Sequence, residues 1–256
     1  MSTHIFLRSR LSRETISFIL CLVIPASVVH AQRDPAAEWN ELYPKIRDGL
    51  VTREEAQAGL KDLETQLRTI YREKGPTTKH PCFVFPLRGY DYHAIGGKEG
   101  NGYRPEGYDF FDGSRHKGHP GHDLFIRDGN QDTLEDETGT PVEVISASSG
   151  VVVSAFRDWV PSSTIRGGNY VWIFEPAEGR YYYYAHLKDV SVKVGQLVSK
   201  GEPLGVVGRT GVNAYKKRSP THLHFTVHQS VDGYPKPINP YLELRRGCEK
   251  ASPGSN

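Results

Sequence analysis

From about Pro81 onward, short runs of β-forming residues alternate with glycine-rich turns. β-Branched and aromatic residues favour strands, and glycine permits the tight turns that connect them. The pattern therefore predicts a mainly β domain with a compact, folded-over sheet. The runs predicted to form strands are Val142–Ala147, Val151–Phe156, Tyr170–Phe174, Tyr181–His186, Leu204–Val207 and His222–Val227.

The segment before the β domain has the pattern of two helices. Asp34 followed by Pro35 is typical of a helix N-cap and its first helical position, and Thr52–Glu55 is a capping box. We expect Pro44 to break or kink the first helix. The second helix has an apolar stripe made of Leu60, Leu63, Leu67, Ile70 and Tyr71. Residues 34–74 thus predict a small helical hairpin, which either only packs on the β domain, or shields a functional site or docks a regulatory partner.

The first thirty-one residues have the pattern of a secretory signal peptide. An apolar run, Ile16–Val29, is followed by small residues that predict cleavage after Ala31. The basic residues at its start are Arg8, Arg10 and Arg13. A transmembrane anchor is the alternative, but Pro25 and the short run disfavour it, because a span needs about 20 apolar residues. We expect an exported protein, periplasmic or secreted, with no membrane contact after cleavage.

Charge and cysteine content narrow the function further. Removal of the signal peptide takes away three arginines and one glutamate, which leaves the chain near neutral and argues against nucleic acid as a partner. Export would leave Cys82 and Cys248, which predict a disulfide, with two unpaired buried thiols as the alternative. The expected domains are a signal peptide (1–31), a helical hairpin and linker (32–78), the β domain (79–250) and a C-terminal tail (251–256).

Histidines in two separate stretches suggest a metal site. His222 and His224 lie two apart in a predicted strand and therefore point to the same face. His119 and Asp123 lie four apart, but the intervening proline and glycine disfavour a helix, so we expect a tight loop. Together with either histidine of the strand they make three nitrogen and oxygen ligands, which is the set that a catalytic zinc site keeps.

A further histidine, His186, lies near the end of the run Tyr181–His186. The chain has no His-Glu-x-x-His helix that would supply a glutamate base. A histidine outside the metal ligands would have to move the proton, and its ordinary pKa suits that task.

Taken together, these motifs resemble the lysostaphin-type, or LytM-like, zinc endopeptidases over about residues 115–228. In chain order they are His119-x-Gly-x-Asp123, Gly139-Thr140-Pro141-Val142, Gly168-Asn169, Tyr184-Ala185-His186-Leu187, Gly195-Gln196-x-Val198-x-x-Gly201, Gly208-x-Thr210-Gly211 and His222-Leu223-His224-Phe225. The resemblance implies a compact antiparallel, sandwich-like β peptidase domain with a groove for peptide.

The same resemblance implies the roles of the site residues. His119, Asp123 and His224 would be the zinc ligands, and His186 and His222 the catalytic histidines. The implied activity is hydrolysis of stem or bridge peptides in bacterial peptidoglycan by a zinc-activated water. A regulator that binds murein without catalysis, with the same fold, is the alternative, although such relatives lack some of the ligands.

Several other residues depart from the family pattern. Thr226 stands where many relatives have an acidic residue. The group that orients the metal ligands is therefore expected to differ from that of the family. His228 shares the face of His224 but lies too far along the strand to bind the same ion. His116 and His122 flank the first motif, and we expect them to be solvated or to face substrate rather than to bind metal.

The loop after the first motif is rich in acidic residues. Asp128, Asn130, Asp132 and Asp136 have part of the spacing of a calcium loop, which makes Ca²⁺ a candidate second ion. Thr133 replaces the turn glycine of such loops, so a solvated acidic loop is the alternative.

Overall fold

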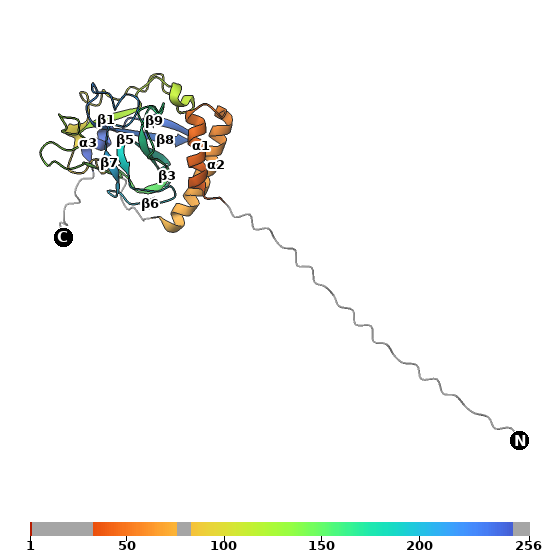
Figure 1. The fold of residues 1–256 in the computed structure, drawn as a ribbon. Coiled ribbons are helices and arrows are strands. Elements are labelled where there is room, and N and C mark those ends of the chain that lie inside the picture. The colour runs from red at the N-terminus through yellow and green to blue at the C-terminus, as the bar shows by residue number, and fades with distance from the viewer. Residues whose placement is uncertain (2–32, 76–82, 248–256) are drawn as a thin grey trace, which may run out of the picture. The chain divides into compact units, whose positions relative to one another are not determined.

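The computed structural model describes Met1 and residues 33–75 and 83–247 (Figure 1). Nearly all of the expected signal peptide, both cysteines of the expected disulfide and the C-terminal tail lie outside these residues. No helix within the described ranges has the length and apolar character needed to cross a membrane.

The two predicted helices are present as α1 (Pro35–Arg47) and α2 (Arg53–Lys74). The Asp34 side chain accepts a hydrogen bond from the Ala36 amide, and Thr52 forms its capping box, so both predicted N-termini are confirmed. The prediction that Pro44 breaks the helix is wrong, because α1 continues through it. Proline removes one helix hydrogen bond there, only a turn before the end, and packing of the buried Trp39 and Ile46 side chains holds the helix together.

The β domain is one sheet in which every strand pair is antiparallel, which confirms the predicted fold class. The main path runs in the order β1-β8-β5-β4-β3-β6, while β9 pairs with β8 and β2 pairs with β7. The strands are β1 (Gly121–Phe125), β2 (Glu143–Ile145), β3 (Gly150–Phe156), β4 (Asn169–Glu175), β5 (Arg180–Val190), β6 (Leu197–Val198), β7 (Pro203–Val207), β8 (His222–Val231) and β9 (Tyr234–Ile238).

Each predicted strand run is confirmed, whereas β1, β6 and β9 were not predicted. The short helical segments η1 (Tyr92–Ala94), η2 (Phe110–Arg115) and α3 (Tyr241–Arg246) were not predicted either. β5 pairs with β4 and β8 along most of its length and then with β7, so the sheet folds over at its end.

The two faces of the main sheet bury different clusters. Leu223, Phe225 and Val227 of β8 lie on one face, within the cluster that also contains residues of β2 and β7. The histidines of β8 have the opposite parity and therefore point to the other face. On that other face, Trp172 and Tyr181 share a cluster with residues of α1 and α2. The helical hairpin therefore packs on the same face of the sheet that carries the histidines.

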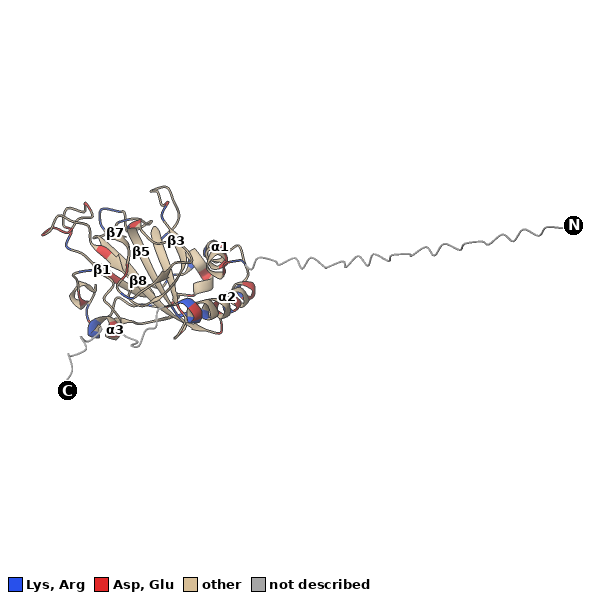
Figure 2. Ribbon diagram, turned by 90° about the horizontal axis from the view of Figure 1, so that it is seen from below, with Lys and Arg blue, Asp and Glu red and all other residues tan. Residues whose placement is uncertain are grey.

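Polar contacts also join the hairpin to the sheet. Trp39 Nε1 donates to the Tyr181 hydroxyl at 3.2 Å, and that hydroxyl donates to Glu64 of α2 at 3.0 Å. Figure 1 shows α1 and α2 together at one side of the sheet, near β3. In Figure 2 the surfaces of α2 and α3 carry charges of both signs, whereas the strands are mostly uncharged.

Candidate metal centre

Strand pairing places the first two candidate ligands. β1 runs antiparallel to β8 with Asp123 directly opposite His224, so the two side chains leave the same face of neighbouring strands. The expected tight loop is wrong in this respect, because Asp123 lies within a strand. Gly121 makes that pairing possible, since a Cβ there would overlap the Phe225 carbonyl oxygen on β8.

His119 precedes β1 and is held by a separate backbone bridge. Its amide donates to the Arg104 carbonyl at 2.6 Å, and the Arg104 amide donates back at 2.8 Å. His119 Nε2 lies 3.2 Å from Asp123 Oδ1, and His224 Nδ1 lies 3.0 Å from the same oxygen. One ligand atom from each of these residues lies within 4.8 Å of the other two. Two imidazole nitrogens and one carboxylate oxygen thus converge on a single point.

The remaining ring nitrogens are fixed by hydrogen bonds. His119 Nδ1 lies 2.8 Å from the Gly102 carbonyl oxygen, to which it can only donate, so Nε2 keeps its lone pair. His224 Nε2 lies 3.0 Å from the Thr226 hydroxyl. The residue that departs from the family pattern therefore holds a candidate ligand in place without a carboxylate. Such contacts orient a metal-binding imidazole and select its tautomer.

His222 and His186 lie beside this cluster with their rings 4.9 Å apart. His222 Nδ1 lies 2.7 Å from the Pro220 carbonyl, and His186 Nδ1 lies 2.7 Å from the Thr210 carbonyl. Each Nδ1 is consequently a donor, and each neutral ring presents the lone pair of Nε2. His222 Nε2 is 3.6 Å from Asp123 Oδ1.

The backbone of His186 is unusual, with a positive φ of 68°. It lies at a bulge, because Asn169 pairs with Leu187 while the next residue, Tyr170, pairs with Ala185. Bulges re-aim side chains, and strained backbone is concentrated at functional sites. The bulge turns the imidazole toward His222 and the candidate ligands, a placement that the strand pattern alone did not reveal.

Electrostatic effects in the cluster favour a negative Asp123 and neutral His224 and His186. Burial lowers the pKa of His119, but its hydrogen bond to Asp123 and the charge of Asp123 outweigh burial, so this pKa is raised. Burial raises the pKa of Asp123, but hydrogen bonds from His119 and His224 outweigh it and hold the pKa well below its usual range. Burial lowers the pKa of His224 against the pull of Asp123, and lowers the pKa of His186 to about 3. Neutral imidazoles and an ionised carboxylate are the forms that bind a metal ion.

A cavity of about 310 Å³ opens over the cluster. Its floor contains Trp172, Tyr183 and His228, and aromatic contacts connect them: Tyr183 stacks on Trp172 at 4.4 Å, and Trp172 lies 5.4 Å from the His228 ring. α1 contributes Tyr43 and Arg47 to the lining. Sequence analysis missed these two residues as parts of the site, since they lie far from the motifs along the chain and form part of an ordinary amphipathic helix.

Comparison with known proteins finds a family match and several relatives. A family model described as Peptidase family M23 matches residues 132–240. The chain is 32% identical to the cell division protein DipM of Caulobacter vibrioides over 167 residues, which are 64% of this chain and 21% of DipM. It is 38% identical to lysostaphin of Staphylococcus simulans over 87 residues, which are 34% of this chain and 15% of lysostaphin. Residues 132–240 therefore match the LytM-like peptidase family, M23.

The catalytic domain of Staphylococcus simulans lysostaphin is also similar as a solved structure, with 26% identity and a TM-score of 0.35 over 52% of this chain and 81% of that domain. The chain spans about a fifth or less of the length of the curated DipM and lysostaphin sequences. The M23 match contains His186, His222 and His224 but begins after His119 and Asp123, which line the same cavity as these three histidines.

Three other histidines have different surroundings. His122 is fully buried, with Nε2 2.9 Å from Asn239 Oδ1, so the expectation that it is solvated or faces substrate is wrong. It lies on β1 with parity opposite to that of Asp123, which turns it away from the cavity. His116 lines the cavity, and burial lowers its pKa to about 4. His228 is buried in the floor of the cavity, and its Nε2 lies 2.8 Å from the Tyr108 hydroxyl.

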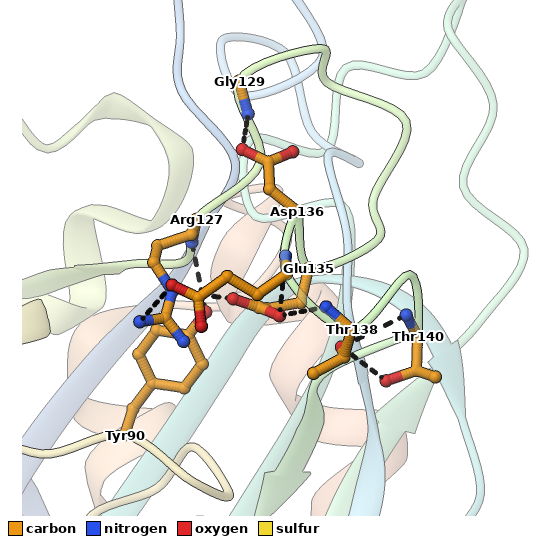
Figure 3. A network of polar contacts seen from close by, with 8 residues as sticks. Tyr90, Arg127, Gly129, Glu135, Asp136, Thr138 and Thr140 are labelled. Atoms are coloured by element: carbon orange, nitrogen blue, oxygen red, sulfur yellow. Dashed lines mark hydrogen bonds and ion pairs between the residues drawn. The ribbon is translucent and has the colours of Figure 1, made fainter.

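The acidic loop does not support the calcium site. Asp128 accepts hydrogen bonds from the amides of Asp132 and Thr133 and from the Thr221 hydroxyl. Asp136 accepts from the Gly129 amide (Figure 3). The Asn130 and Asp132 side chains accept from amides within the loop. The oxygens thus cap the loop's own backbone instead of converging on one point. Among the described residues, the cluster whose ligand atoms could hold a metal ion is formed by His119, Asp123 and His224.

Proposed function

We propose that this chain is a zinc peptidase that hydrolyses peptide bonds in bacterial peptidoglycan. The observation that carries the proposal is the convergence of His119 Nε2 and His224 Nδ1 on Asp123 Oδ1, beneath a cavity that His186 and His222 also line. The M23 match supports peptide hydrolysis, and the likeness to lysostaphin supports the cell wall as the source of the substrate.

The donor set fits zinc. Two neutral imidazoles and one carboxylate are ligands that zinc accepts, and three protein ligands leave a position for water or substrate. Zinc at such a site lowers the pKa of bound water and polarises the scissile carbonyl. The hydrogen bonds to Gly102 and Thr226 keep the ligand nitrogens correctly directed.

Two histidines of the chain would move the proton. His222 Nε2 carries a lone pair and lies close to the ligand carboxylate, which suits it to accept the proton of the attacking water. His186 also presents a lone pair at Nε2, so in this tautomer it can donate to a developing oxyanion only after it has taken up a proton. Its carbonyl contact with Thr210 would steady the imidazolium formed in that step.

The test is incubation of metal-loaded protein with purified peptidoglycan, followed by mass analysis of the released peptides. We expect zinc-dependent release of peptides, abolished in His119→Ala together with zinc binding. His93→Ala is the matched control, because His93 is an exposed histidine on η1 that does not line the cavity. His222→Ala should bind zinc normally yet lose turnover, and full turnover in that variant would contradict its role as base.

A murein-binding regulator without catalytic activity remains the second candidate. Binding of peptidoglycan without release of any peptide, across wall types and with zinc bound, would support it. The complete set of ligand and catalytic residues in one cavity favours the enzyme. We further propose export to the periplasm or exterior, with residues 1–31 as the signal peptide, because the substrate lies there.

A further inference from the structure

Three neighbouring segments form the wall of the cavity over the metal centre. Gly113 of η2 packs so closely on the end of α1 that a Cβ there would overlap the carbonyl oxygens of Ile46 and Arg47. Arg166, in the loop before β4, reaches across to η2 and donates from Nη1 to the carbonyls of Ser114 and His116 at 3.4 and 2.9 Å. α1, η2 and this loop therefore form a continuous wall around the floor made by the strands.

The cavity is lined by more positive than negative side chains. The charged residues that line the cavity are Arg47, Asp123 and Arg166. Arg47 forms an ion pair with its neighbour Asp48 at 2.7 Å, and Asp123 lies among the candidate metal ligands. Arg166 contacts backbone carbonyls, and within the described part of the chain no carboxylate forms an ion pair with it. Since a divalent ion would more than offset Asp123, the cavity of the loaded protein would favour an anionic ligand.

Arg166 is held in a defined place relative to the catalytic histidine. The carbonyl of the next residue, Gly167, accepts a hydrogen bond from the His186 amide at 2.8 Å. Gly211 lies against the Arg166 carbonyl and the His186 ring, where a side chain would overlap both. A guanidinium has five N–H donors, and the contacts to Ser114 and His116 use Nη1 alone, so other donors of Arg166 are free for a ligand.

We propose that Arg166 is a specificity-determining residue that pairs with a free carboxylate of the peptide bound in this cavity. The inference rests on the proposed peptidase function, whose substrate it narrows to short peptide segments bearing a carboxylate near the scissile bond. The size of the cavity is at the lower end of the range for small-ligand sites, which agrees with a short segment. A planar guanidinium matches a carboxylate through paired hydrogen bonds, which a lysine reproduces only in part.

The carboxylate could belong to an acidic side chain or to the chain end, and matched peptides separate these sources. The probes are N-acetylated stem pentapeptides in which the glutamate carboxylate, the terminal carboxylate, or both are converted to carboxamides. Binding is measured by calorimetry on zinc-loaded protein that carries His222→Ala, in which turnover is expected to be lost, and all Arg166 variants are made in this background. We expect roughly tenfold weaker binding when the recognised carboxylate is amidated, a factor typical of a charge-assisted contact that is partly exposed.

Variants locate the effect at Arg166. In Arg166→Gln the carboxylate and carboxamide peptides should bind equally, while Arg166→Lys should retain part of the preference. Arg72→Gln on the exposed surface of α2 is the control and should behave as the wild type. An unchanged preference in Arg166→Gln, or no preference when Arg166 is intact, would overturn the proposal. Failure of the peptidase function would appear separately, as no hydrolysis of any probe by the zinc-loaded protein.

Discussion

The hydroxyl of Thr226 lies 3.0 Å from Nε2 of His224, two residues away on the same face of β8. Thr226 is buried, so this contact is shielded from water and replaces the acidic residue expected from the family pattern. The other nitrogen of His224 lies 3.0 Å from Asp123. A neutral hydroxyl thus completes the orientation of this ligand. The site therefore carries one negative charge fewer than it would with a carboxylate at this position.

Replacement of Thr226 by valine should weaken zinc binding. Valine keeps the shape of threonine but leaves His224 Nε2 without its partner, and loss of such a supporting contact typically costs about 10-fold or more in metal affinity. Thr226→Ser retains the hydroxyl and serves as the control. Competition titration with a chromophoric chelator would measure the affinity, and an equal dissociation constant in valine and serine variants would contradict the role given to the hydroxyl.

Removal of the metal should abolish turnover without unfolding the domain. The two hydrophobic clusters on opposite faces of the sheet contain none of the candidate ligands, so the fold has its own core. Far-UV circular dichroism of chelated protein should match that of the loaded form. Zinc at a hundredfold excess over its dissociation constant should add about 2.7 kcal/mol to the free energy of unfolding. Loss of secondary structure on chelation would show instead that zinc is needed for folding.

The strands and helices were largely predictable because their signals are local. Each predicted strand run has the alternation or β-branched content of a half-buried strand, and the caps at Asp34 and Thr52 are short-range patterns. β1 was missed because Gly121 reads as a turn residue. Its glycine is required instead by the close approach of β8, a contact between segments about a hundred residues apart.

The candidate ligands could be named from motif spacing, but their surroundings could not. The wall of the cavity depends on Tyr43, Arg47 and Arg166, whose positions follow from packing between α1, η2 and the loop before β4. The burial of His122 likewise follows from strand parity in a strand that was not predicted. In the acidic loop, by contrast, the sequence suggested a site that the structure does not support. Its residue types suit calcium, but its hydrogen bonds turn the oxygens toward the backbone.

Alanine at Gly113 should destabilise the wall of the cavity. Gly113 has φ 54° and ψ −130°, and a Cβ would also overlap two carbonyl oxygens at the end of α1. The expected loss is about 2–4 kcal/mol, from backbone strain together with displacement of η2. Gly89→Ala separates the two causes, because Gly89 also has a positive φ of 80° but nothing within 4 Å of its Cβ position.

Equilibrium unfolding in urea would compare the two alanine variants. Gly89→Ala should cost about 1–2 kcal/mol from strain alone. Equal losses in the two variants would mean that the contact between η2 and α1 adds nothing to stability.

The buried carboxyl group of Glu64 should make stability depend on pH. Its side chain is 6% exposed, and Oε1 accepts hydrogen bonds from Tyr181 at 3.0 Å and from Ser230 at 2.6 Å. Burial raises the pKa of Glu64, and the hydrogen bonds from Ser230 and Tyr181 offset this only in part. Between the unfolded pKa, about 4.3, and the higher folded pKa, the unfolded chain binds fewer protons at this site than the folded chain does.

Stability contributed by Glu64 is therefore fully present below about pH 4.3 and is lost as the pH rises through the folded pKa. Glu64→Gln keeps an oxygen that can accept both hydrogen bonds but cannot ionise. Its free energy of unfolding, measured on metal-free protein and compared with wild type, should shift in favour of the variant as the pH rises from 4 to 8. Glu73→Gln, at an exposed position of the same helix, is the control. A difference between Glu64→Gln and wild type that stays constant over this range would show that Glu64 is not held in its protonated form by burial.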